Sequence, residues 1–213
     1  MIYEERRTVL KGELLDDYLA LCRETLWPSL RQAGGRVVCA LSGLIGDPRS
    51  EVLQMTSFPD VGSWQAAQGK LTAERGELVE LEEVRLMRPV ASRPKEVIPR
   101  EDRRAIYGYR RFFVAPVDLA EFVFCSEEGI WPRIEAQGAC VLGLWSTVAA
   151  TSPLEVVLIT GYHDPAHWQE TRDDRPMPQG FDERLWERNM DLRARRTAMT
   201  MRTWVRLKRA IEL

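Results

Sequence analysis

The sequence is poor in several residues and motifs that mark particular functions. It has two histidines, and only four of its 30 basic residues are lysine. It contains no G-x-x-x-x-G-K-[ST] phosphate loop, no G-x-G-x-x-G turn and no G-x-S-x-G nucleophile elbow. It therefore gives no support for nucleotide or NAD binding, or for Ser-His-Asp catalysis.

The sequence also lacks an excess of basic charge and a long apolar run. Its 30 basic residues are balanced by 32 acidic ones, for a net charge of -2, whereas nucleic acids and anionic membranes bind concentrated basic surfaces. No apolar run approaches the ~18 residues of a membrane span, and the first residues lack a basic-then-apolar signal pattern. We expect a cytoplasmic protein with no nucleic-acid or membrane partner.

The sequence does contain an internal repeat. Ile2-Tyr3 recurs as Ile106-Tyr107, and many later residues return at the same offset. Ordinary composition gives a chance match of roughly 6% per position, far below the agreement seen here. The chain therefore holds two copies of one unit. The matched pairs include Arg6/Arg110, Trp27/Trp131, Pro28/Pro132, Glu51/Glu155, Asp60/Asp164 and Trp64/Trp168.

The four cysteines are not part of this repeat. Cys22, Cys39, Cys125 and Cys140 include no C-x-x-C pair, and each faces a different residue type in the other copy. A disulfide or zinc framework would have been duplicated with the unit. We therefore predict four buried free thiols.

The first copy, residues 1–90, follows the order β-α-β-β-α-β. Apolar residues at three- and four-residue steps predict a helix over 13–32, with a kink or restart near Trp27 because Pro28 follows it. Asp60 is a good N-cap for a second helix over about 61–76. Alternation and turn residues predict the strands 2–10, 36–45, 51–58 and 80–88.

Residues 91–104 carry two prolines and many charges and are predicted to form an extended linker. The second copy, residues 105–213, repeats the plan with an insertion over 170–196. That insertion begins with a loop at 170–180 and continues as a solvated helix over 181–196, anchored by Trp186 and Met190. The other predicted elements are a strand at 106–114, a helix at 118–137, a hairpin at 139–162, a helix after Asp164 and a strand at 198–207.

A β-α-β-β-α-β unit is ferredoxin-like, with two helices on one face of the sheet and the other face bare. A bare apolar face has to be buried. We therefore predict an α+β fold in which two fused ferredoxin-like units pack sheet to sheet as an intrachain dimeric α/β barrel. A homo-oligomer stays an open alternative.

Several ordered features resemble the NIPSNAP family, which belongs to the dimeric α/β-barrel superfamily. The resemblance covers nearly the whole chain as a tandem pair, although Gly108 replaces the motif glutamate in the second copy. It implies the fold given above. Relatives in the superfamily include cofactor-free monooxygenases, isomerases, cyclases and haem-binding enzymes, and fold does not choose among them. The motif residues are Ile2-Tyr3-Glu4-x-Arg6, Pro28, Gly34-Gly35, Glu51-Val52, Phe58 and Asp60.

His163 and His167, the two histidines, both lie in the second copy, at a strand end and on the first turn of a helix. Such an i, i+4 pair could bind a metal, and one imidazole could ligate haem or act as a base. No third ligand stands at motif spacing, and the Glu of H-E-x-x-H is missing. We take both as candidate catalytic residues without a metal or other cofactor. Surface or capping histidines are the alternative.

Arg110 is a candidate for binding an anionic or carbonyl-bearing ligand. Its counterpart Arg6 could pair with Glu4 or Glu51, because a buried arginine needs an acidic partner. In the second copy Gly108 removes the Glu4 carboxylate and opens space. The alternative is an Arg110 satisfied by Glu155 or by backbone carbonyls.

Aromatic side chains of the second copy complete the candidate site. Tyr107 could donate a proton or hydrogen bond to a substrate oxygen. Trp145, which the first copy lacks, could line an aromatic pocket together with Tyr109, Trp168 and Tyr162. Packing in the core is the alternative for each of them.

The differences between the copies indicate where a pocket would lie. The second copy has gained both histidines, Trp145, Gly108 and the insertion. We hypothesise a pocket in the second copy, between its sheet and helices, with residues 170–180 as a lid.

The sequence supports a small-molecule-binding protein, with two readings of different class. The first is a cofactor-independent enzyme of specialised metabolism, an oxygenase, isomerase or cyclase acting on an apolar or aromatic substrate. The second is a non-catalytic NIPSNAP-like binding or scaffold protein. A haem- or metal-dependent enzyme using His163 or His167 is a further alternative.

Overall fold

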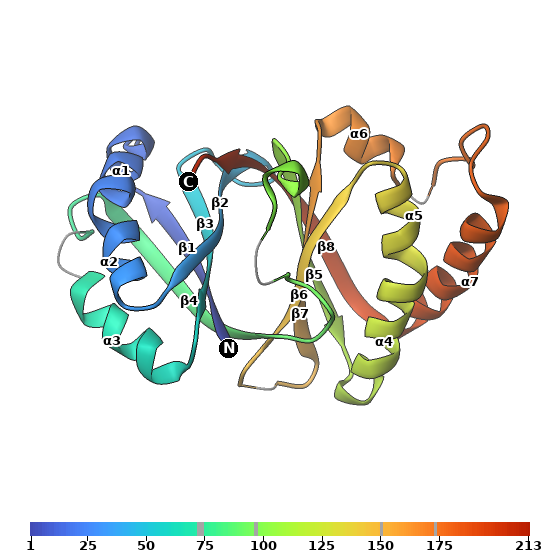
Figure 1. The fold of residues 1–213 in the computed structure, drawn as a ribbon, viewed down its shortest axis with the longest axis horizontal. Helices are drawn as coiled ribbons and strands as arrows, with labels where there is room; N and C mark the ends of the chain where they lie inside the picture. Colours follow the sequence, from blue (N-terminus) through green and yellow to red (C-terminus); the bar gives the residue numbers. More distant parts are fainter. Residues whose placement is uncertain (72–74, 96–97, 150, 173) are drawn as a thin grey trace. The chain divides into compact units, whose positions relative to one another are not determined.

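The computed structural model describes residues 1–71, 75–95, 98–149, 151–172 and 174–213 (Figure 1). Contacts divide the chain into two compact units. Unit 1 contains Met1–Arg88 and Leu207–Leu213, and unit 2 contains Pro89–Arg206. The last residues of the chain therefore belong to the first unit.

The sheet of unit 1 is antiparallel throughout. Its strand order is β4-β1-β3-β2, and the end of β8 pairs with β2 through Ala40↔Ile211 and Gly43↔Lys208. Strand order and connections are those of a ferredoxin-like unit. The elements are β1 (Ile2–Leu10), α1 (Leu15–Leu21), the π-helical turn η1 (Cys22–Leu26), α2 (Trp27–Gln32), β2 (Arg36–Ile45), β3 (Glu51–Phe58), α3 (Val61–Leu71) and β4 (Val79–Pro89). Of the helix predicted over 61–76, residues 72–74 lie outside the described residues.

One face of this sheet is covered by α1, α2 and α3 (Figure 1). Because side chains alternate along a strand, Ile2 and Leu10 of β1 face these helices and join a core with Tyr18 and Trp27. The residues between them on the same face, Glu4, Arg6 and Thr8, are also buried. The interior of unit 1 is therefore partly polar.

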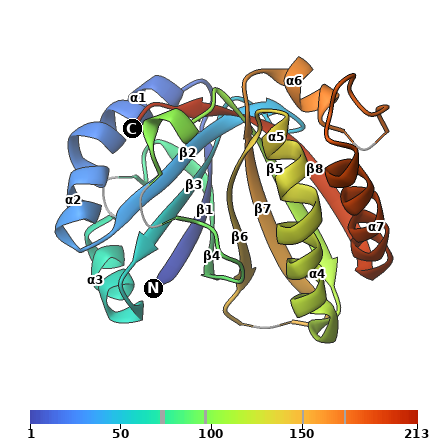
Figure 2. The same ribbon diagram turned by 45° about the vertical axis from the view of Figure 1, so that its right-hand side comes forward.

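Unit 2 repeats the arrangement with strand order β6-β7-β5-β8. Figure 2 shows α4, α5 and α7 side by side on one face of its sheet, and the core beneath them is apolar. The elements are η2 (Arg100–Asp102), β5 (Ile106–Val114), η3 (Pro116–Asp118), α4 (Leu119–Cys125), the π-helical turn η4 (Ser126–Ile130), α5 (Trp131–Ala136), β6 (Cys140–Thr147), β7 (Leu154–Tyr162), α6 (Pro165–Glu170), α7 (Glu183–Met199) and β8 (Thr200–Ile211).

The Trp-Pro pair interrupts the first helix of each unit in the same way. A five-residue π-helical turn precedes Trp27-Pro28 and another precedes Trp131-Pro132. A proline inside an α-helix removes one hydrogen bond, and its ring clashes with the carbonyl four residues earlier. A π turn widens the helix just before the proline, and Trp27 stays helical with φ -68° and ψ -38°. The interruption expected near Trp27 is therefore a π turn without a restart.

The helix of the insertion packs more closely than its charged sequence suggested. Asp182 caps α7 by accepting a hydrogen bond from the backbone N–H of Leu185 at 3.1 Å. Leu192 is buried and lies against Gly129, where an added Cβ would be 2.7 Å from the Leu192 Cβ. The prediction that Met190 anchors this helix is wrong, because Met190 is 43% exposed and Leu192 takes that role.

The predicted α+β class and the two ferredoxin-like units are confirmed. Three of the predicted segments contain positions outside the described residues. These are 96–97 in the linker, 150 in the hairpin at 139–162 and 173 in the insertion. Among the residues that the structure describes, no helix is long and apolar enough to cross a membrane.

All four cysteines are buried and free, as predicted. Burial raises the pKa of Cys22 to about 12 and also raises the pKa of Cys125 and Cys140. Because the thiolate is the reactive form, we expect labelling of the native chain at pH 8 to be at least about 100-fold slower than labelling of the unfolded chain. Absorbance of a thiol-reactive chromogenic disulfide, with and without guanidinium chloride, measures both rates. Fast labelling of native protein would contradict the buried assignment.

Candidate functional site

The predicted site residues of unit 2 do not all lie on one side of its sheet. Tyr107 and Tyr109 alternate with Arg110 along β5, so the tyrosines and the arginine point to opposite faces. Trp145 pairs with Val157, which pairs with Arg111, and therefore shares the face of the tyrosines. Arg110 shares the helix-covered face with Tyr162. The structure thus separates Tyr107, Tyr109 and Trp145 from His163, His167, Arg110, Tyr162 and Trp168.

His167 is held by backbone groups on both sides of its ring. Its Nδ1 accepts a hydrogen bond from the His163 N–H at 3.1 Å, and its Nε2 lies 2.9 Å from the Gln137 carbonyl oxygen. These partners fit the neutral ring with its proton on Nε2. The backbone N–H of His167 donates to Asp164, the N-cap of α6, at 2.8 Å. The ring orientation is therefore fixed.

His163 lies beside it and is exposed. The two imidazole rings are stacked, with centroids 4.9 Å apart. The ring of His163 forms no hydrogen bond with the described residues. Among those residues, no group of three or more His, Cys, Asp or Glu side chains is placed to hold a metal ion.

A groove of about 1040 Å³ opens beside His167, and we call it the unit 2 groove. It lies between the end of α5, helix α6 and the first part of the insertion. The insertion therefore lines a groove, at the place where the sequence suggested a lid. The lining residues include Gln137, His167, Glu170, Thr171, Arg175, Pro176, Pro178 and Phe181.

Arg133 connects the walls of this groove. It is 1% exposed, and its guanidinium donates to Asn189 Oδ1 at 3.1 Å, Gln137 Oε1 at 3.0 Å and the Thr171 carbonyl oxygen at 2.8 Å. One side chain thus joins α5, the end of α6 and α7. Sequence reasoning missed Arg133 and Asn189, because the insertion has no counterpart in the first copy.

Tyr162 lies behind His167, with ring centroids 5.8 Å apart in an edge-to-face contact. Burial raises the pKa of its hydroxyl, although the positive charges of Arg110 and Arg133 partly oppose this. The expectation that Gly108 opens space is wrong. An added Cβ there would lie 3.2 Å from the Tyr162 ring, which fills the position.

Other residues predicted for the site contact neighbouring protein groups. The Tyr107 hydroxyl accepts a hydrogen bond from the Arg104 N–H at 3.0 Å. Trp168 on α6 stacks with the Arg172 guanidinium, 5.2 Å from the ring centroid. Glu155, the alternative partner for Arg110, forms an ion pair with Arg111.

Unit 1 has a buried ionic network where unit 2 has its candidate residues. Arg6 donates two hydrogen bonds to Glu4, at 2.8 and 3.0 Å, and a third to Glu82 at 2.8 Å. Trp64 and Gln68 of α3 donate to the same Glu4 oxygen at 2.6 and 2.8 Å. Of the two partners predicted for Arg6, Glu4 is the one observed, whereas Glu51 pairs with Arg7 and Lys208. The sequence did not reveal Gln68 or Glu82, which close the network from other elements.

Unit 2 shows that the fold does not require this network. At the positions of Glu4, Thr8 and Gln54 it carries Gly108, Phe112 and Leu158, and its core there is apolar. The change also alters the hydrogen bonding of the matched tryptophans, Trp27 and Trp131. Trp27 Nε1 donates to Gln54 at 2.8 Å, whereas the buried Nε1 of Trp131 has no hydrogen-bond partner among the described residues.

No protein-family model and no curated protein matches the chain. Solved structures match over its whole length. An inferred monooxygenase from Lactobacillus acidophilus is 10% identical over 100% of this chain and 98% of its own, with a TM-score of 0.65. An anthrone oxidase-like protein is 10% identical over 99% of this chain and 91% of its own, with a TM-score of 0.63. A NIPSNAP family protein from Agrobacterium tumefaciens is 26% identical over 41% of this chain and 91% of its own, with a TM-score of 0.36.

At 10% identity the two full-length matches show the fold alone. They confirm the resemblance predicted from the sequence at that level.

The buried network of unit 1 predicts a strong effect of losing Arg6. We expect Arg6→Ala to lower the free energy of unfolding by about 3–5 kcal/mol, because the buried Glu4 and the half-buried Glu82 then lose their shared cation. Arg31→Ala, an exposed arginine of the same unit, serves as the control and should change it by less than about 0.5 kcal/mol. Guanidinium denaturation followed by circular dichroism measures both. Equal losses in the two variants would refute the network's role.

The same network predicts loss of stability in acid. Burial alone would raise the pKa of Glu82, but Arg6 and Arg75 outweigh it and hold that pKa below its ordinary value of 4.5. The ionised carboxylate therefore stabilises the fold above about pH 4.5, and this contribution is lost as pH falls through the lower, folded pKa. We expect Glu82→Gln to be less stable than the natural chain at pH 7 and to lose less on acidification. Denaturation curves at pH 7, 4 and about 3 give the comparison. Parallel pH profiles for both chains would contradict it.

Proposed function

We propose that the chain is a small-molecule enzyme of the cofactor-independent oxygenase type, and that its substrate binds in the unit 2 groove. One observation carries the proposal. A groove of about 1040 Å³ is lined by His167 and, on one side, by the insertion that the first copy lacks. Small-molecule sites have volumes of about 300–1,000 Å³. The full-length fold shared with an inferred monooxygenase and an anthrone oxidase-like protein supports the reaction class by analogy.

The lining fits a largely apolar substrate with one or two oxygen atoms. Pro176, Pro178 and Phe181 supply apolar surface, while Gln137 and Thr171 supply polar groups. Arg175 adds a positive charge at the same wall, which would favour an oxyanion formed on the substrate. This combination suits an aryl ketone with an activated methylene group, or its phenol tautomer.

His163 is the proposed base, because its ring is exposed, forms no hydrogen bond with the described residues and stacks on the ring of His167, which lines the groove. His167 is a positioning residue, since both its nitrogens are bound to backbone groups and its ring stacks on that of His163. In the proposed reaction His163 removes a proton from an activated methylene group, and the resulting carbanion reduces dioxygen. One oxygen atom becomes a carbonyl oxygen on that carbon, and the other leaves as water with the two methylene hydrogens.

A non-catalytic small-molecule-binding protein is the second candidate. The satisfied ring of His167 favours it, because fully bonded histidines commonly have structural roles. An isomerase or cyclase would use the same base without consuming dioxygen.

An oxygen electrode and a small panel of phenols and aryl ketones, anthrone among them, test the proposal. We expect the natural chain to consume dioxygen with at least one panel member, and His163→Ala to lower kcat/KM by about 100-fold or more. Arg184→Ala, on α7 and outside the groove lining, is the control and should keep full activity. Full activity in His163→Ala would remove the proposed base. Binding of panel members without oxygen uptake would favour the binding protein.

A further inference from the structure

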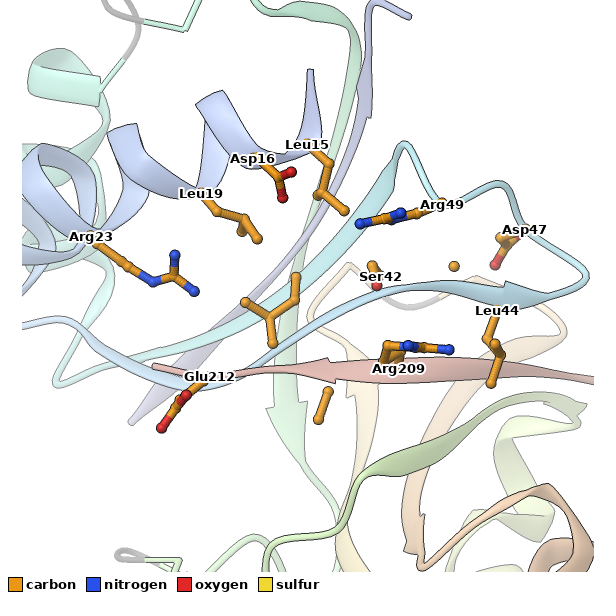
Figure 3. A pocket seen from close by; sticks show the side chains of 13 residues that line it. Leu15, Asp16, Leu19, Arg23, Ser42, Leu44, Asp47, Arg49, Arg209 and Glu212 are labelled. Carbon is orange, nitrogen blue, oxygen red and sulfur yellow. The ribbon is translucent and has the colours of Figure 1, made fainter. Parts of the chain in front are cut away.

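Unit 1 has a cleft of about 480 Å³ that shares no residue with the unit 2 groove (Figure 3). It lies between α1, the turn joining β2 to β3, and the last residues of β8, all within unit 1. We call it the unit 1 cleft.

One wall of the unit 1 cleft is apolar and fixed. Leu15, Leu19 and Ile211 line it and are also members of the unit 1 core. Each is less than 10% exposed, so the core holds these side chains in place. This wall would accept a hydrocarbon chain or ring without rearrangement.

Three arginines border the same cavity from three different elements. In Figure 3, Arg23 and Arg49 reach into the opening from opposite ends, and Arg209 lies along β8. All three are exposed, and their side chains form no hydrogen bond or ion pair with the described residues. Guanidinium groups bind carboxylates and phosphates in a bidentate way.

Carboxylates also line the cleft, so its net charge depends on residues of both signs. Asp16 and Glu212 are exposed at the rim and offset part of the positive charge. The side chain of Asp47 is 3% exposed, and Lys208 Nζ neutralises it at 2.6 Å. The three arginines therefore outnumber the two carboxylates that lack such a partner among the described residues.

The repeat supplies an internal control for these charges. The apolar wall is retained in unit 2, where Leu15 and Leu19 correspond to Leu119 and Val123. The charged residues are not retained, because Arg23 corresponds to Glu127 and Arg49 to Pro153. The fold thus keeps Leu15 and Leu19 apolar in both units, whereas Arg23 and Arg49 are specific to unit 1.

The position of Arg49 depends on a close backbone contact. A Cβ added to Gly43 would lie 2.0 Å from the Pro48 carbonyl oxygen, so the turn can approach β2 only with glycine there. The matching residue of unit 2 is Thr147. Gly43 therefore brings the turn, and with it Arg49, over the cleft.

From this geometry we infer that the unit 1 cleft binds a small amphipathic organic anion. Its carboxylate or phosphate group pairs with Arg23 or Arg49, and its apolar part lies on Leu15, Leu19 and Ile211. The inference does not depend on the reaction proposed for unit 2.

Isothermal titration of the full chain with four probes tests this inference. Octanoate and octyl phosphate carry both parts of the ligand, octanol carries only the apolar part, and inorganic phosphate carries only the charge. We expect one or both amphipathic anions to bind at least about ten-fold more tightly than octanol and phosphate, since binding uses both walls. The ratio of the two amphipathic probes tells whether carboxylate or phosphate is preferred.

Matched charge variants identify the site. We expect Arg23→Gln/Arg49→Gln to weaken binding of the preferred anion by about ten-fold or more, with its unfolding curve unchanged. Arg31→Gln/Arg88→Gln removes two exposed arginines outside the cleft and should bind as the natural chain does. Equal weakening in both double variants, or no binding of either amphipathic anion by the natural chain, would overturn the inference.

Discussion

The buried ammonium group of Lys208 holds the last strand segment of unit 1 in place. Its Nζ lies 2.6 Å from Asp47 and 2.7 Å from Glu51 and has no exposed surface. Glu51 is in turn 2.7 Å from Arg7. A buried charge is tolerated only with partners of opposite sign, and removing one partner costs about 3–5 kcal/mol. Because Lys208 stands beside Gly43 of β2, this interaction fixes the β8 segment that forms one side of the unit 1 cleft.

The two units show how one backbone plan carries two different interiors. Unit 1 keeps Glu4 and Arg6 as the centre of a buried hydrogen-bond network, whereas unit 2 replaces Glu4 by glycine and fills the position with the Tyr162 ring. The Trp-Pro pair and its π turn persist in both, because they belong to the helix itself. The π turn was therefore retained after the duplication, while the buried side chains of the two units diverged.

Local patterns in the sequence predicted the strands, the turns and the order of elements, because alternation and turn residues act over a few positions. Contacts between distant residues were not predictable in that way. Glu51 and Lys208 are 157 positions apart, and Arg133 and Asn189 are 56 apart. The grouping of Tyr107 with Arg110 failed for a different reason. Strand alternation already places neighbours of odd and even number on opposite faces.

The candidate groove of unit 2 depends on Arg133 more than on the residues that would touch a ligand. Its three hydrogen bonds fix Gln137 on one wall and Thr171 on the other, while Asn189 anchors α7 behind them. The segment between Thr171 and α7 is thus tied at both ends, and its described residues Arg175, Pro176, Pro178 and Phe181 line the opening. Since binding is strongest when the walls need no reordering, a buried arginine outside the groove lining would set affinity by holding the groove open.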